Sequence, residues 1–172
     1  MRSLFLVFAN ICLLRRGPEL VPTQSWFVLT VAIADLVTSF VVSNQLSGTL
    51  TPVALATSLI VTMATTAAIT WIALYLRGFD VRFPATITAI FGCDLLFTVI
   101  VAVVATATGG IGSSSIAIGL VAAVGIWSIA VNGFILHRAI EVNVVLGVAI
   151  AFGMAMIGFV LSGAAVGPPA TP

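Results

Sequence analysis

The stretch that decides the fold is Ser25–Asn44, SWFVLTVAIADLVTSFVVSN, in which Asp35 is the one ionisable residue. As a helix rising 1.5 Å per residue, it is about 30 Å long, which matches the hydrocarbon core of a bilayer. The strands of an outer-membrane barrel would instead form shorter segments with alternating polarity. The stretch therefore predicts a transmembrane helix that has Ser25 as its N-cap.

Four further apolar runs follow, and each is long enough to cross a bilayer. They are Pro52–Leu76, Pro84–Thr108, Ser114–Leu136 and Asn143–Ser162. Only HRAIEVN, residues 137–143, separates the last two runs. One continuous helix over both would be about 73 Å long, more than twice the hydrocarbon thickness. We therefore expect a tight turn over residues 137–143 and five spans in all.

The composition also indicates a membrane protein. Of the 172 residues, 61% are hydrophobic, and the charged ones are six arginines and five acids. Soluble domains hold about 25% charged residues, so this chain cannot cover itself with polar surface. Five spans with short connections use up its length. The predicted fold is all-α, a polytopic integral membrane helix bundle forming a single domain over residues 1–172, with a flexible tail over 163–172.

Several function classes are not supported by the sequence. A chain without lysine and with a net charge of +1 offers no basic surface to nucleic acid. Cys12 and Cys93 lie in apolar runs without CxxC spacing or a neighbouring histidine, so neither a disulfide framework nor a metal site is predicted. Motifs for nucleophilic, phosphoryl-transfer or metalloprotease chemistry are missing. We expect no catalytic residues, no cofactor and no enzymatic activity.

The N-terminal segment Leu4–Leu14, LFLVFANICLL, is too short to span. As a helix it reaches about 16 Å, half the hydrocarbon thickness. The residues that follow, RRGPE, do not form a signal-peptide cleavage site. We predict a short interfacial helix over residues 3–16, ended by Gly17-Pro18. The alternative is a short helix packed against the bundle.

The arginines predict the orientation. Three of them, Arg2, Arg15 and Arg16, precede the first span. Arg77 and Arg82 lie between the second and third spans, and Arg138 lies between the fourth and fifth. The remaining loops are uncharged, so the positive-inside rule places the N-terminus in the cytoplasm and the C-terminus outside. An arginine-only chain rich in Ala, Val, Gly and Thr is typical of GC-rich coding sequences, which indicates a bacterial inner membrane.

Two acids fall inside the spans. Asp35 and Asp94 each lie about 15 Å along a span that runs in the same direction, so both are expected near the midplane. Because no span contains Arg or Lys, the acids must be protonated, hydrogen-bonded or bound to a cation. One interpretation is a proton or cation site completed by Thr65 or Thr66 of the second span. The other is that each acid is a neutral hydrogen-bond partner between helices.

Two further groups of residues have structural interpretations. His137 and Glu141 are four residues apart and form, with Arg138, a predicted cytoplasmic charge cluster, for which a solvated loop is favoured over a proton relay or metal site. Small residues recur in the fifth span, where they let helix backbones approach closely. These predicted helix-packing residues are Gly147, Ala151, Ala155 and Gly158.

The stretch GIWSIAVNGFILHRAIEV, Gly125–Val142, and the Gly17-Pro18 pair before the first span carry a resemblance. Together with the five-span arrangement, they resemble the Yip (Ypt-interacting) membrane-protein family and its bacterial relatives. The resemblance implies a non-enzymatic role in membrane organisation or trafficking.

Two functions are consistent with these features. The first is a non-catalytic scaffold, accessory subunit or membrane-organising protein, whose partners are the lipid bilayer and further copies or other membrane subunits. The second is a small proton- or cation-coupled transport component that uses Asp35 and Asp94.

Overall fold

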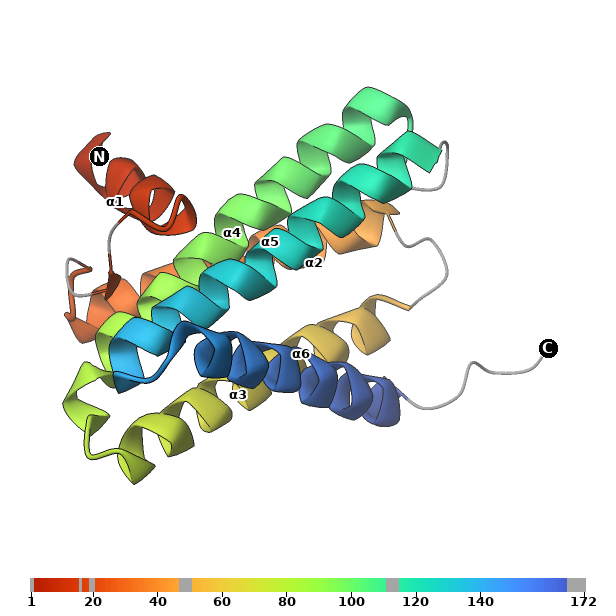
Figure 1. Cartoon of the computed structure of the whole chain (residues 1–172). Helices are drawn as coiled ribbons and strands as arrows, with labels where there is room; N and C mark the ends of the chain where they lie inside the picture. The colour runs from red at the N-terminus through yellow and green to blue at the C-terminus, as the bar shows by residue number, and fades with distance from the viewer. Residues whose placement is uncertain (1, 16, 19–20, 47–50, 111–114, 167–172) are drawn as a thin grey trace.

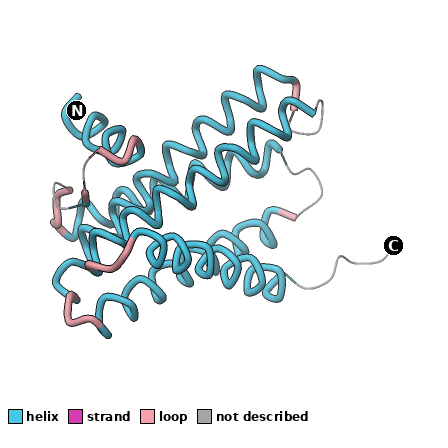
Figure 2. Tube along the Cα trace, viewed as in Figure 1, coloured by secondary structure: helices cyan, strands magenta, loops and turns pink. Residues whose placement is uncertain are grey.

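The computed structural model describes residues 2–15, 17–18, 21–46, 51–110 and 115–166. In these residues it is all-helical, with no strand (Figures 1 and 2). The elements are α1 (Arg2–Cys12), α2 (Ser25–Leu46), α3 (Pro52–Leu76), the 3₁₀ turn η2 (Asp80–Arg82), α4 (Phe83–Thr108), α5 (Ser115–Ile140) and α6 (Val144–Val166). Helices α2 to α6 are the five that are long and apolar enough to cross a membrane, which confirms the expected all-α bundle.

Local sequence signals account for several helix ends. Thr51 caps α3, because its hydroxyl accepts a hydrogen bond from the Ala54 amide at 3.3 Å, and Pro52 takes the first helical position. Helix α4 ends at Gly109, whose φ of 75° is left-handed. The next amide, of Gly110, then donates to the Ala105 carbonyl at 2.8 Å, which closes the last turn.

Two predicted boundaries were wrong by about one turn. Helix α5 continues past Leu136 to Ile140, because residues 137–140 contain neither Gly nor Pro. The chain reverses over residues 141–143 instead, where Glu141 has a left-handed φ of 55°. Helix α6 continues past Ser162 to Val166, so the first residues of the predicted tail are helical. The rest of that tail, 167–172, lies outside the described residues.

The five long helices pack around two shared helices, α4 and α6 (Figure 1). Helix α4 lies between α2 and α5, and α6 packs on both α5 and α3; towards the end away from η2, α3 and α6 diverge from the other three helices. Helix α4 is central, and residues 85–93 of its first half are all buried. The core around α4 includes side chains of α1, α2 and α5, and a second core joins α3, α5 and α6.

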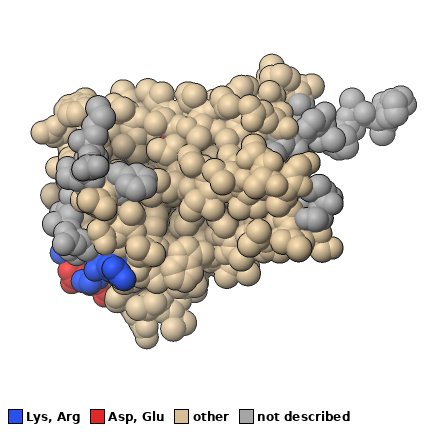
Figure 3. Space-filling model, turned by 90° about the horizontal axis from the view of Figure 1, so that it is seen from above, with Lys and Arg blue, Asp and Glu red and all other residues tan. Residues whose placement is uncertain are grey.

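The outer face of the bundle is apolar. Along α2, Leu29, Ile33 and Val37 follow one another at helical spacing and are 60%, 51% and 54% exposed. Visible charged side chains gather at one end of the molecule instead (Figure 3). Apolar side chains in contact with the surroundings along whole helices indicate lipid contact, so the chain is an integral membrane protein.

Helices α5 and α6 approach most closely at two glycines. A Cβ atom on Gly147 would lie 2.4 Å from the Gly133 carbonyl oxygen, and one on Gly133 would lie 2.6 Å from the Val148 Cα. Gly147 is thus a packing residue as predicted, whereas its partner Gly133 was missed. Ala151 is buried in the second core, beside α5 and α3.

The predicted small-residue row does not stay on one face. Each four-residue step turns the helix by about 40° beyond a full rotation, so the row rotates out of the interface after two steps. Ala155 is accordingly exposed and takes no part in packing within the chain. Gly158 is buried on the side facing α3, where a Cβ atom would meet the Thr62 methyl group at 3.5 Å.

Helix α1 packs against the bundle, which is the second of the two alternatives for the N-terminal segment. Gly92 of α4 makes room for the Phe8 ring, since a Cβ atom there would lie 2.3 Å from the ring. Ile11 is fully buried, and the Trp127 indole donates a 3.0 Å hydrogen bond to the Cys12 carbonyl. The helix ends at Cys12 rather than at residue 16, and Leu14 turns the chain with a φ of 58°.

Candidate functional site

Asp35 and Asp94 line the same small cavity inside the bundle. The cavity has a volume of about 140 Å³ and lies between α2, α3 and α4. Its lining residues are Asp35, Leu36, Ser39, Leu59, Thr62, Met63, Thr66, Phe91 and Asp94. Helices α2 and α4 both start at the end of the bundle where the charged side chains gather, which we call the arginine-bearing end. Each acid comes about three turns later, so the two acids lie at equal depth.

Asp35 has the less satisfied environment of the two acids. It is 5% exposed, and its Oδ1 atom is buried without a hydrogen-bond partner among the described residues. Ser39, one turn further along α2, also lines the cavity, and its hydroxyl lies 3.4 Å from the Thr98 hydroxyl of α4. Burying an ionised carboxylate costs several kcal/mol unless it is fully paired. Asp35 therefore needs a bound proton or a cation.

Asp94 has a partner on a fourth helix. The side-chain amide of Asn132, on α5, donates to Asp94 Oδ1 at 3.3 Å. The carbonyl oxygen of Asn132 is buried and has no partner among the described residues. Because an amide carries donors and an acceptor, Asn132 can bind a carboxylate through its NH₂ group or a protonated carboxyl through its oxygen. Asn132 was not predicted, although an amide within an apolar span is itself a signal of a polar interior.

Helix α3 contributes hydroxyl groups, but only one of the two predicted threonines. Thr66 lines the cavity with both acids. Thr65 does not line it, and its hydroxyl donates to the Val61 carbonyl of its own helix at 2.7 Å. Neighbouring helical residues point about 100° apart, so one of the pair had to face elsewhere. One turn after Thr66, the Thr70 hydroxyl is fully buried and has no partner in the described part of the chain.

The cavity combines two carboxyl groups with no positive charge. No Arg, Lys or His is among the described residues that line it. Its volume accommodates a few water molecules at about 30 Å³ each. Groups of three or more His, Cys, Asp or Glu side chains that fit a metal ion are not found within the described residues. Two neighbouring acids that share a small cavity without a counter-charge disfavour each other's ionisation, so the arrangement is suited to holding a proton.

Comparison of the chain with protein-family models, curated proteins and solved structures finds no match. The resemblance to the Yip family therefore stays a prediction.

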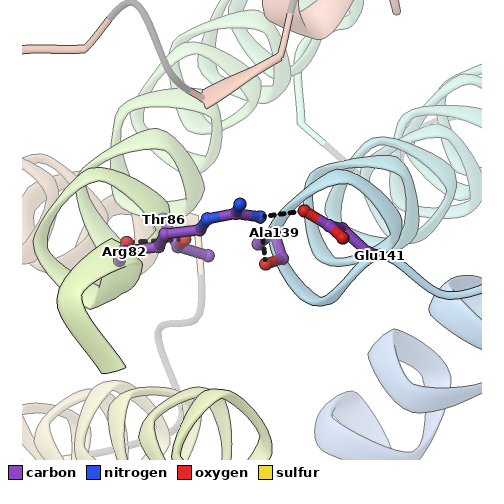
Figure 4. Close-up of polar contacts among 4 residues, drawn as sticks. All are labelled: Arg82, Thr86, Ala139 and Glu141. Carbon is purple, nitrogen blue, oxygen red and sulfur yellow. Dashed lines mark hydrogen bonds and ion pairs between the residues drawn. The ribbon is translucent and has the colours of Figure 1, made fainter. Parts of the chain in front are cut away.

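The three residues of the predicted cytoplasmic charge cluster, His137, Arg138 and Glu141, interact with different partners. Glu141 forms a 2.8 Å ion pair with Arg82, the last residue of η2 (Figure 4). The His137 ring hydrogen-bonds the Val142 carbonyl through Nδ1, and the Arg138 guanidinium lies over the Phe134 ring, 5.6 Å from its centre. His137 and Glu141 do not share a helical face, because α5 ends at Ile140 and Glu141 turns away.

Arg82 connects the two turns at this end of the bundle. Besides pairing with Glu141, its guanidinium donates to the Ala139 carbonyl at 3.3 Å (Figure 4). That carbonyl lies in the last turn of α5 and has no partner within the helix. The side chains of Arg82 and Glu141 are 44% and 57% exposed, so the pair adds less than about 1 kcal/mol to stability. The role of this ion pair is to hold the turn at η2 against the turn after α5.

Proposed function

We propose that the protein is a small, non-catalytic proton-coupled membrane transport component in which Asp35 and Asp94 bind the proton. One observation carries this proposal: both carboxyl groups line the same small cavity, where Asp35 Oδ1 is buried without a hydrogen-bond partner among the described residues. Acids inside membrane spans are costly and mark ion or proton pathways. The scaffold hypothesis would be equally served by apolar residues at both positions.

The chemistry of the cavity favours a proton over a larger cation. Asn132 offers Asp94 a donor when the acid is ionised and an acceptor when it is protonated, so both states are supported. A metal cation needs about six oxygen ligands at fixed distances. Two carboxyl groups and the Ser39 and Thr66 hydroxyls supply few such ligands from a cavity of this size.

The proposal includes an orientation and an assembly. Arg77, Arg82 and Arg138 all follow or precede spans at the same end of the bundle, and by the positive-inside rule that end faces the cytoplasm of a bacterial inner membrane. The N-terminus then lies inside and the C-terminus outside. Five spans enclose little space of their own, so we propose that transport takes place in a homo-oligomer or with another membrane subunit.

Proton flux into liposomes tests the proposal. We expect purified protein to dissipate an imposed pH gradient, measured with an entrapped pH-sensitive dye. Asp35→Asn and Asp94→Asn should each remove this flux, because a side-chain amide does not bind and release a proton at the pH values of the assay. The matched control is Asp80→Asn, which alters an exposed acid in η2 outside the spans and should leave the flux unchanged.

Two measurements separate this function from the alternatives. Circular dichroism and gel filtration show whether each variant folds, so that a lost flux is assigned to the site. A sodium gradient in place of the pH gradient distinguishes sodium coupling from proton coupling. Wild-type flux in folded Asp35→Asn and Asp94→Asn would refute the transport proposal and leave the scaffold role.

A further inference from the structure

A second cavity lies at the arginine-bearing end of the bundle. It is bounded by the segment before α2, by η2 and the start of α4, and by the end of α5 with the turn after it. Its volume is about 840 Å³, within the roughly 300–1,000 Å³ typical of small-molecule sites. Because it lies where spans begin and end, its level is that of lipid headgroups rather than of the hydrocarbon core.

The walls of this cavity combine apolar and cationic groups. Phe134 and Val142 contribute apolar surface, and Arg82, Arg138, His137 and Glu141 contribute the polar groups. Glu141 is the one acid among the described lining residues, and its carboxylate is paired with Arg82. The charges of that pair cancel, so the positive charge of Arg138 is not balanced within the described lining.

Arg138 is held in place and still has its donors available. Its guanidinium lies over the Phe134 ring, and it makes no ion pair or hydrogen bond with the described residues. Stacking on a ring orients a guanidinium while its N–H groups remain at the edge. A guanidinium presents these donors as a planar fork that fits two oxygens of a phosphate group.

We propose that this cavity binds the phosphate headgroup of an anionic phospholipid, with Arg138 as the phosphate ligand. The apolar walls accommodate the glycerol and the first methylene groups of the acyl chains. A lipid is favoured over a soluble phosphate because the helices next to the cavity expose apolar side chains on their outer faces, as helices in contact with lipid do. Glu141 keeps Arg82 occupied, so a single guanidinium is left for the headgroup.

Native mass spectrometry of the protein in neutral detergent tests this site. With phosphatidylglycerol as the probe, we expect one tightly bound lipid, and with phosphatidylcholine about tenfold weaker binding. Arg138→Gln should weaken phosphatidylglycerol binding about tenfold, the change expected for one charge-assisted contact. Arg77→Gln is the matched control, because Arg77 is exposed at the same end but does not line the cavity.

A second variant keeps the test independent of any damage caused at Arg138. Glu141→Gln removes the partner of Arg82 and should strengthen phosphatidylglycerol binding severalfold, whereas a purely structural role for this cluster would weaken it. Equal losses in Arg138→Gln and Arg77→Gln would overturn the proposal by showing unspecific attraction. Displacement of the lipid by millimolar glycerol phosphate would overturn it in favour of a soluble phosphate ligand.

Discussion

The two polar regions of this bundle differ in how their charged groups are satisfied. At the arginine-bearing end, Arg82 and Glu141 meet at 2.8 Å, and both side chains are about half exposed. In the middle of the bundle, Asp35 and Asp94 share a cavity with no cationic side chain among its described lining residues, and one carboxyl oxygen has no described partner. The outer pair fixes the turns at little energetic cost. The inner pair is expected to destabilise the bundle, because its carboxyl groups are buried without a counter-charge among the described residues that line the cavity, and this cost is consistent with the proposed proton site.

Of the changes that test this contrast, removing both inner acids should alter the free energy of unfolding most. In Asp35→Leu/Asp94→Leu/Asn132→Leu, leucine side chains fill the cavity, no carboxyl group remains to be buried, and the amide that pairs with Asp94 is not left without its partner. We expect the free energy of unfolding to rise by about 1–4 kcal/mol, as for other buried polar groups replaced by apolar ones. Unfolding in mixed detergent, followed by circular dichroism, measures the change. A loss of stability would mean that the two acids contribute to packing between the helices, and it would contradict the contrast between the two regions.

Removing only the partner of Asp94 should act in the opposite direction. Asn132→Leu leaves the Asp94 carboxyl without its donor, and we expect a loss of about 1–3 kcal/mol in the same unfolding assay. The loss should disappear when Asp94→Leu is combined with it, since no buried carboxyl is then left unpaired at this position. An equal loss in both backgrounds would show that Asn132 acts through packing alone.

The smallest effect is expected at the outer pair. A double-mutant cycle with Arg82→Gln and Glu141→Gln should give a coupling energy of about 0.2–1 kcal/mol, because the two charges are screened by water. The coupling should decrease at high salt. A coupling above 3 kcal/mol would contradict the contrast between the two regions, because it would show that this pair is also desolvated.

The sequence was sufficient to predict the five spans and the equal depth of the two acids. Prolines mark the starts of α3 and α4. Counting residues from the start of α4 gives the depth of Asp94 in the membrane without any tertiary information. The rotation of each helix was not predictable, because these spans are apolar on all sides and carry no stripe that distinguishes inside from outside. For this reason the choice between Thr65 and Thr66, and the exposure of Ala155, could be settled only by the packing.

The end of α5 shows a second limit of sequence analysis. Residues 137–140 are compatible with both a helix and a polar turn, and the left-handed conformation of Glu141 decides where the chain reverses. Glutamate is an unusual residue for that conformation. Its pairing with Arg82, which is distant in sequence, is a contact that no local pattern reveals.

The docking of α1 has a consequence for the order of assembly. The hydrogen bond from Trp127 to Cys12 joins residues 115 positions apart, and Phe8 fits over Gly92 on a helix that is synthesised much later. Because synthesis proceeds from the N-terminus, α1 leaves the ribosome before α4 and α5 exist. It must wait at the membrane until both helices have been inserted. Of the helices described, the first to be made is among the last to reach its final position.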